Sequence, residues 1–262
     1  MPAAHLRTNQ PAPKPYKGIA MEGPIAKWYT KVRQRDQELG TVVRQVSQVL
    51  PAGGRILEVA PGPGYLAIEL AKIGKYQILG LDISKTFVEI AQGKAKEAGV
   101  AIDFRHGNAS NMPFDADSFD LIICRAAFKN FTEPVRALHE MHRVLKPGGK
   151  ALVMDLRRDA SLEDIKIHVN SLDLSWINTL IAKWTFKLFL LKNAYTSGEI
   201  RQLIFATRSV CRTTGRHNMS IMAGSLDDPS WFQPQADIYA ASAQPWDYMN
   251  PDLPKFPGLP QT

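Results

Sequence analysis

The chain has 262 residues, of which 45% are hydrophobic and 22% charged, a composition typical of one globular domain with additions. Two cysteines argue against a disulfide scaffold, and no apolar run reaches the roughly 18 residues that cross a bilayer. The net charge of +7 comes from scattered basic residues, which argues against a nucleic-acid-binding face. Without a signal-peptide core at its start, the sequence predicts a cytoplasmic protein.

The N-terminal region predicts an arm followed by helix. Residues 1–20 contain four prolines and few large apolar side chains, so we expect an arm without regular structure. Residues 21–50 have helical periodicity in two apolar stripes. The first stripe consists of Ile25, Trp28, Tyr29 and Val32, and we expect its aromatic residues to be core more often than ligand contacts.

Strand and helix patterns then alternate, which predicts an α/β fold with a doubly wound, mostly parallel sheet covered on both faces. The expected strands are 55–59, 77–81, 101–106, 119–124 and 150–155. The expected helices are 65–73, 85–98 and 133–145.

The alternation ends after Asp155. Residues 161–192 predict a long helical stretch, and Ser197 is a candidate N-cap of a further helix. Two weak strands are expected near 209–213 and 218–223. We therefore expect a main domain over 21–225, with helical lid segments near 21–33 and 161–195, and a Pro-rich tail over 226–262 that packs on it.

A glycine loop between the first strand and the next helix is the strongest functional signal. Gly62, Gly64 and Ala67 match G-x-G-x-x-A, and Asp82 ends the next strand. Such a loop lets backbone N–H groups approach a nucleotide-like ligand, while the acid can accept hydrogen bonds from ribose. Taken alone, this match is a weak signal: it is compatible with a nicotinamide dinucleotide and, less often, with a structural turn.

Further motifs narrow the choice of ligand for the glycine loop. Glu58 precedes the loop, and the segment 107–114 follows the third expected strand. The segment 114–120 leads into the fourth expected strand. The segment 143–150 contains Lys-Pro-Gly-Gly and joins the last expected helix to a strand. Together they resemble the class I S-adenosylmethionine-dependent methyltransferases, in the small-molecule group called methyltransferase type 11, over roughly residues 50–155. The resemblance implies a Rossmann-like, seven-stranded sheet with an antiparallel last strand, and S-adenosyl-L-methionine as the cofactor.

The resemblance also implies roles for the loop. Ala60, Pro61, Gly62 and Gly64 would pass beneath the methionine portion and the ribose, and Glu58 would support the loop or its ligand. Ala60 stands where the family usually has glycine. Its methyl group is expected to be tolerated on the condition that the backbone there keeps a negative φ.

The later strand ends would complete the cofactor site. By the resemblance, Asp82 would bridge the ribose hydroxyls, Ile83 would pack on the adenine, and Asn108 and Ala109 would flank its other edge. Asn108 replaces a frequent aspartate, but its side-chain oxygen can still accept from the adenine amino group. Arg125 would lie at the rim near the transferred methyl.

The nicotinamide alternative finds less support in the rest of the chain. The Tyr-x-x-x-Lys pair that often accompanies hydride transfer is absent, since Tyr29 is followed at that spacing by Arg33, and Tyr195 by Glu199. No metal is expected, because His139 and His142 lack the i, i+4 spacing of a zinc helix.

Methyl transfer is an in-line displacement that depends chiefly on positioning, so a catalytic signature can be faint. The catalytic residue is not identified by the sequence; Tyr29, Arg125 and Lys129 are candidates. Aromatic residues in both lid segments favour a small, apolar or aromatic organic acceptor.

Two alternatives remain open. Residues 176–192 place Lys183 and Lys187 one turn apart among aromatic residues, which is compatible with a membrane-associated methyltransferase of a lipid or quinone, although a packed lid is favoured. The second alternative is a non-catalytic module that binds S-adenosylmethionine.

Overall fold

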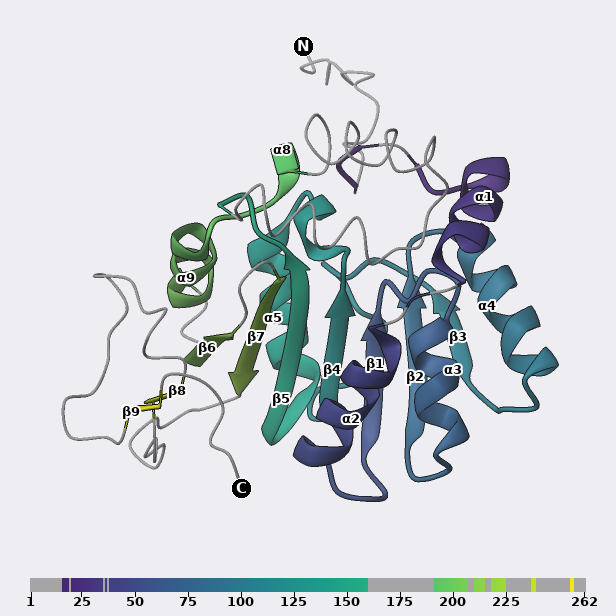
Figure 1. Ribbon diagram of the computed structural model, residues 1–262, viewed down its shortest axis with the longest axis horizontal. Helices are drawn as coiled ribbons and strands as arrows, with labels where there is room; N and C mark the ends of the chain where they lie inside the picture. Colours follow the sequence, from purple (N-terminus) through teal and green to yellow (C-terminus); the bar gives the residue numbers. More distant parts are fainter. Residues whose placement is uncertain are drawn as a thin grey trace, which may run out of the picture. The chain divides into compact units, whose positions relative to one another are not determined.

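A computed structural model gives the arrangement of the chain (Figure 1). It describes residues 16–18, 20–34, 36, 38–159, 191–206, 210–214, 218–224, 237–238 and 255–256. The chain divides into two compact units, Met1–Ser225 and Leu226–Thr262. The predicted lid over 161–190 and most of the predicted arm lie outside the described residues, so both stay predictions.

The first unit is built on one sheet with strand order β3-β2-β1-β4-β5-β7-β6. Its strands are β1 (Arg55–Val59), β2 (Gln77–Asp82), β3 (Asp103–His106), β4 (Phe119–Arg125), β5 (Leu145–Leu156), β6 (Val210–Thr214) and β7 (Asn218–Gly224). The five strands β1 to β5 pair in parallel, whereas β7 pairs antiparallel with both β5 and β6. The predicted α/β fold with a mostly parallel sheet is confirmed.

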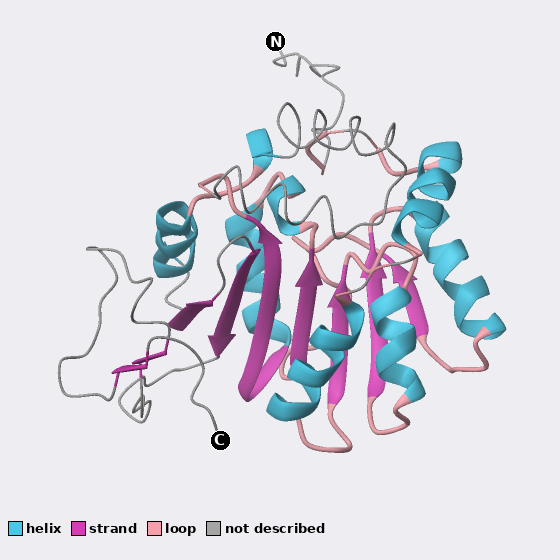
Figure 2. Ribbon diagram, in the orientation of Figure 1, coloured by secondary structure: helices cyan, strands magenta, loops and turns pink. Residues whose placement is uncertain are grey.

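Helices cover both faces of this sheet (Figure 2). They are α1 (Gly23–Arg33), α2 (Leu39–Val49), α3 (Tyr65–Lys72), α4 (Lys85–Glu97), the 3-10 turn η1 (Phe128–Asn130), α5 (Pro134–Val144), α8 (Leu191–Asn193) and α9 (Ser197–Ala206). The sequence predicted one helical stretch over 21–50, but the structure divides it into α1 and α2. The break contains Asp36, whose carboxylate accepts a hydrogen bond from the Glu38 backbone N–H, an arrangement that competes with continued helix.

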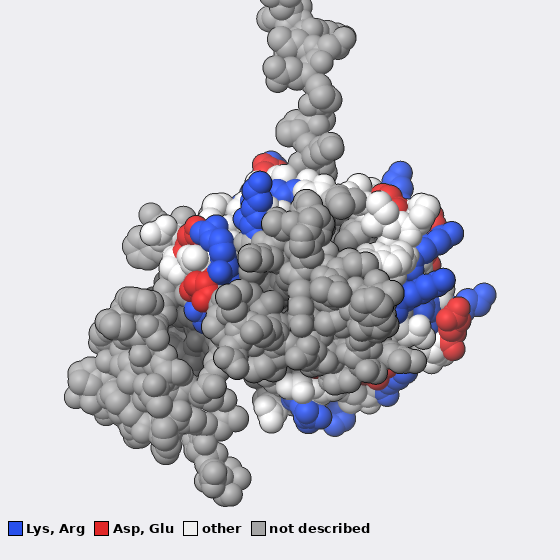
Figure 3. All heavy atoms as spheres, turned by 45° about the horizontal axis from the view of Figure 1, so that its top comes forward, with Lys and Arg blue, Asp and Glu red and all other residues white. Residues whose placement is uncertain are grey.

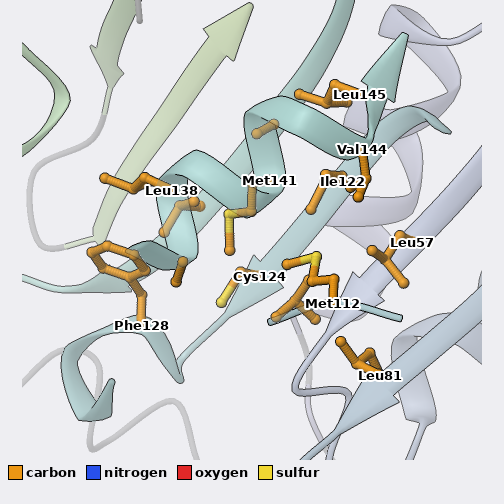
Figure 4. Packing of buried hydrophobic residues seen from close by; sticks show 14 of the residues in the cluster. Leu57, Leu81, Met112, Ile122, Cys124, Phe128, Leu138, Met141, Val144 and Leu145 are labelled. Atoms are coloured by element: carbon orange, nitrogen blue, oxygen red, sulfur yellow. The ribbon is translucent and has the colours of Figure 1, made fainter. Parts of the chain in front are cut away.

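The strands bury alternate side chains in two separate cores, one on each face. On one face, Leu57, Ile122 and Cys124 pack with Leu138 and Met141 of α5 (Figure 4). On the other face, the buried residues of β1, β2 and β4 pack against α2, α3 and α4. Burial on both faces explains why these strands read as continuous apolar runs in the sequence. Cys124 is fully buried, as the sequence predicts for a small apolar residue.

Two helix starts show how local sequence fixes the connections. The Ser84 hydroxyl caps α4 by accepting from the Phe87 N–H at 3.0 Å. At α9 the predicted cap, Ser197, is wrong by one residue. Thr196 accepts from the Glu199 N–H, and the Glu199 carboxylate accepts from the Thr196 N–H in return, which is a capping box.

The second unit contains the short strands β8 (Asp237–Ile238) and β9 (Lys255–Phe256), which pair in parallel. Packing of the tail on the main domain stays a prediction. Within the first unit, strand order reverses between β1 and β4. In open α/β sheets, ligands bind outside the carboxyl ends of the strands at such a reversal.

Candidate functional site

The glycine loop joins β1 to α3 at the carboxyl edge of the sheet. Gly62 and Gly64 have φ values of 56° and 77°, and Gly64 is the N-cap of α3. A Cβ at Gly64 would lie 2.9 Å from both Ala91 Cβ and Phe104 Cζ. Only glycine therefore lets this turn approach α4 and β3 closely. A Cβ at Gly62 would meet nothing within 4 Å, so the loop there faces open space.

The backbone at Ala60 corrects one expectation. Its φ is 56°, not negative, although its N–H still bonds to the Leu81 carbonyl at 2.8 Å. An alanine in the left-handed region costs roughly 1–2 kcal/mol relative to an ordinary conformation. The loop is held in this shape by its neighbours rather than by the preference of residue 60.

We therefore expect Ala60→Gly to raise the free energy of unfolding by about 1 kcal/mol, because glycine relieves the strain at positive φ. Urea unfolding followed by circular dichroism measures this change. The matched control, Ala71→Gly within α3, should instead lower stability by about 1 kcal/mol. An Ala60→Gly protein no more stable than the parent would show that the strain is absent.

Asp82 lies at the end of β2, facing the loop. It is only 5% exposed; its Oδ2 accepts from the Gly62 N–H at 2.9 Å and its Oδ1 from the Ser84 N–H at 2.8 Å. Burial raises its pKa to about 6, although these hydrogen bonds act in the opposite direction. The Ile83 N–H also bonds to this carboxylate. Because a carboxylate has about four acceptor positions, Asp82 can hold the loop and still receive a ligand hydroxyl.

Glu58 lies one strand away, as the next-to-last residue of β1. One carboxyl oxygen accepts from the Ala67 N–H in the first turn of α3, while Oε2 is buried with no hydrogen-bond partner. Burial raises the pKa of Glu58 to about 8, opposed by the positive charge of Arg125. A buried acceptor without a partner is costly, which makes it a position where a ligand donor would be favourable.

The raised pKa of Glu58 has a consequence for stability. Between pH 6 and 8 the folded chain holds a proton that the unfolded chain has released, so the free energy of unfolding falls as pH rises, by about 2 kcal/mol in total. Glu58→Gln should remove most of this fall, whereas Glu69→Gln, at an exposed site, should not. Urea unfolding at each pH tests this, and equal slopes in the parent and in Glu58→Gln would refute it.

The remaining predicted cofactor residues line the next strand ends. Ile83 is partly exposed, and its carbonyl oxygen lies 3.1 Å from the His106 Nε2. The Asn108 Oδ1 accepts from the Ser110 N–H at 2.9 Å, which fixes the turn after β3 and leaves the amide nitrogen free of that bond. Ala109 is partly buried against the core that contains α5. The structure thus brings the predicted set to one edge, while ligand contacts at these residues stay a proposal.

Comparison with known proteins agrees with this geometry. Residues 57–153 match the model of a family described as a methyltransferase domain. The match runs from β1 to β5 and includes the loop, Asp82 and Asn108. Residues 57–153 form a class I S-adenosylmethionine-dependent methyltransferase domain of the type 11 group.

Two curated proteins are similar to this chain in sequence. An uncharacterized methyltransferase, YcgJ, of Bacillus subtilis is 33% identical over 145 residues, 54% of this chain and 56% of the relative. The ubiquinone/menaquinone biosynthesis C-methyltransferase UbiE of Bdellovibrio bacteriovorus is 38% identical over 105 residues, 40% of this chain and 45% of the relative. The chain thus spans about half the length of these curated relatives.

A solved structure extends the likeness in fold. The crystal structure of a putative S-adenosyl-L-methionine-dependent methyltransferase from Methanococcus maripaludis superposes with a TM-score of 0.64. It is 22% identical and covers 81% of this chain and 97% of that one. Here the likeness shows the fold alone.

The cofactor of the methyltransferase domain is S-adenosyl-L-methionine, and the acceptor capacity of Asp82 and Glu58 fits its hydroxyl and ammonium groups.

Arg125 ends β4 and belongs to an ion-pair network at the rim of the methyltransferase domain. Its guanidinium donates to Asp36 at 2.6 and 3.1 Å and to Glu38 at 2.7 Å, and Arg33 also binds Asp36. Burial alone would raise the pKa of Asp36, but the two arginines hold it below its usual value. Arg125 therefore fastens the α1–α2 connection to the sheet, and contact with cofactor or acceptor stays a proposal.

Lys129, the second catalytic candidate, lies in the interior. Only 3% of its surface is exposed, and its Nζ donates to Asp155 at 2.6 Å and to the Ala126 carbonyl at 2.7 Å. The Lys129 backbone N–H also donates to Asp155, at 2.9 Å. We assign this side chain to joining η1 and β5, because a buried and paired ammonium is not placed to orient an acceptor.

Sequence reasoning missed part of the N-terminal segment, which it treated as an arm. Tyr16 forms an isolated β-bridge with Phe131, and the Lys17 N–H donates to the Asn130 carbonyl at 2.7 Å. Burial raises the pKa of Tyr16 to about 12, with further contributions from Tyr29, Asp82 and Asp155. Tyr16 therefore lies near the carboxyl ends of β2 and β5.

Tyr29, the third catalytic candidate, lies partly exposed on α1 with its ring edge-on to Phe87, 5.9 Å between centroids. Asp36 and Glu38 were also missed, because no local sequence signal marks the helix break between the two apolar stripes. No group of three potential metal ligands occurs in the part of the chain that the structure describes.

Proposed function

We propose that this chain binds S-adenosylmethionine at the carboxyl ends of β1 and β2 and transfers its methyl group to a small, apolar or aromatic organic acceptor. The observation that carries the proposal is the Asp82 carboxylate, held by Gly62 and Ser84 N–H groups at the start of a glycine loop. Three backbone N–H groups use three of the roughly four acceptor positions of this carboxylate, and the remaining position suits a ribose hydroxyl.

The residues of this chain act by binding and alignment. When bound, S-adenosylmethionine supplies a methyl group activated by a positively charged sulfur. Asp82 accepts from the ribose, and the unpartnered Glu58 Oε2 accepts from the ammonium group, which favours release of the Glu58 proton. Correct positioning of two reactants contributes much of the rate in such transfers, so a dedicated base is not required by the proposal.

Aromatic side chains support the proposed acceptor class. Phe128 lies 5.4 Å from Phe131 and 5.9 Å from Tyr195 between ring centroids, directly after the end of β4. Tyr16 joins this group through its bridge to Phe131. A relative named as a quinone-biosynthesis C-methyltransferase indicates that a reduced quinone ring is a suitable first acceptor to test. Phe128 and Phe131 are buried, whereas Tyr16 and Tyr195 are partly exposed, so the two tyrosines are the rings of this group that could stack on such an acceptor.

The test is transfer of a radiolabelled methyl group. Purified protein is incubated with labelled S-adenosylmethionine and either a naphthohydroquinone, a polar amine or a short RNA, and the extracted products are counted. We expect label in the hydroquinone fraction. Label only in the amine or RNA would overturn the acceptor class, and cofactor binding without label in any organic acceptor would favour the non-catalytic module.

A further inference from the structure

Helix α1 exposes an apolar stripe. Ile25 is 42% exposed, Trp28 60% and Val32 39%, and these are the large hydrophobic residues identified as exposed in the described part of the chain. Their spacing of three and four residues puts them on one face of the helix. The sequence favoured a core position over a ligand contact for Trp28, and that prediction is wrong.

The face of α1 that points to the protein is made of small side chains instead. Ala26 and Thr30 are buried. The Thr30 carbonyl accepts from the Tyr65 hydroxyl at 3.0 Å, which fastens α1 to the start of α3. With α1 fixed in this rotation, Trp28 and its neighbours point away from the protein.

Positive charge adjoins the stripe. Lys27 and Lys31 are exposed one turn apart, and the helix sequence contains no acidic residue. Glu22, just before the helix, is occupied with the N–H groups of Lys85 and Thr86 at the start of α4. Figure 3 shows lysine and arginine side chains gathered on its right-hand side, where α1 and α4 lie in Figure 1.

We propose that α1 is a docking helix for an anionic lipid surface, with Ile25, Trp28 and Val32 in the interface and Lys27 and Lys31 beside the head groups. Apolar residues, a tryptophan and lysines on adjoining faces are the features of helices that lie on membranes. A second protein fits less well, because three side chains on one helix provide much less than the roughly 800 Å² per partner of a stable interface.

The start of α1 is linked to Asp82 through Ser84. The Ser84 hydroxyl donates to the Met21 carbonyl at 2.5 Å, just before α1, and Ser84 also donates its N–H to Asp82. Docking would bring the carboxyl edge of the sheet to the lipid surface, from which an apolar acceptor could enter. That last step rests on the proposed function, whereas docking itself does not. In the described residues, no helix is both long and apolar enough to cross a membrane, so contact through α1 is peripheral.

Vesicle flotation tests the proposal with the full chain. We compare vesicles of phosphatidylcholine alone with vesicles of equal parts phosphatidylcholine and phosphatidylglycerol. The parent protein should float with the anionic vesicles. Ile25→Ser/Trp28→Ser should reduce binding about tenfold, and Lys27→Glu/Lys31→Glu should abolish the preference for anionic lipid.

Controls separate docking from folding and from the proposed function. Lys75→Glu/Lys150→Glu makes the same change in charge at exposed residues on the amino edge of the sheet, and should float like the parent. Calorimetry with S-adenosylhomocysteine should give the parent's affinity in every variant, which shows that each is folded. Parent protein that does not float, serine variants that float equally well, or a dimer that the serine variants abolish would each overturn the proposal.

Discussion

Replacing Asp82 with alanine is expected to weaken binding of S-adenosylhomocysteine about 100-fold, because a ligand hydrogen bond to a charged group contributes roughly 1.5–3 kcal/mol and the loop is loosened as well. The substitution also removes the acceptor that holds the Gly62 N–H. The loop would then lose its link to β2 as well as its ligand contact. Isothermal calorimetry measures the effect directly.

Two further variants serve as comparisons for Asp82→Ala. Asp82→Asn keeps the shape and one acceptor oxygen, so its affinity should lie between those of the parent and the alanine variant. Asp103→Ala, at the start of β3 and paired with Arg105 on the surface, should bind like the parent. Affinity within threefold of the parent in Asp82→Ala, with normal circular dichroism, would contradict the proposed cofactor site.

Replacing Lys129 with methionine should lower the free energy of unfolding by about 3–5 kcal/mol. The change leaves the Asp155 carboxylate buried without its cation, and breaking a buried pair from one side typically costs this much. Two backbone N–H groups still donate to Asp155, but neither replaces the cation that is lost. Urea unfolding should show a clearly lower midpoint.

The control for Lys129 is Lys72→Met. Lys72 pairs with Glu69 at a similar distance, 2.7 Å, but both side chains are about half exposed. Its loss should cost less than about 0.5 kcal/mol, since solvent screens the pair. If Lys129 instead orients the acceptor, its methionine variant would keep the parent's stability and lose methyl transfer, which would refute the structural role.

Local patterns were sufficient to predict the sheet. The apolar runs before Gly62 and before Asp82 are strands because burial on both faces demands continuous apolar sequence, and the glycine turn between β1 and α3 has few alternative conformations. The position of Asp82 could be predicted from the same alternation of strands and helices, because the carboxyl ends of parallel strands meet at one edge of the sheet. These features depend on residues close in sequence.

Features that depend on distant residues were missed. The helix break at Asp36 is stabilised by Arg125, 89 residues away, so no local signal marks it. Periodicity identified the stripe containing Trp28 but not which way it faces, because Tyr65 sets the rotation of α1. The positive φ of Ala60 was missed because the other residues of the loop impose it. The burial of Lys129 follows from its pairing with Asp155 on a later strand.

The hydrogen bonds from Tyr65 and Ser84 to the backbone around α1 have a thermodynamic consequence. Tyr65 begins the helix after the glycine loop, and Ser84 caps the helix after Asp82, so the same two residues connect α1 with both halves of the cofactor site. Any ligand that tightens this region therefore also restricts α1. Linkage is reciprocal: if occupancy of the site alters the affinity of α1 for a surface by some factor, that surface alters the affinity for the cofactor by the same factor.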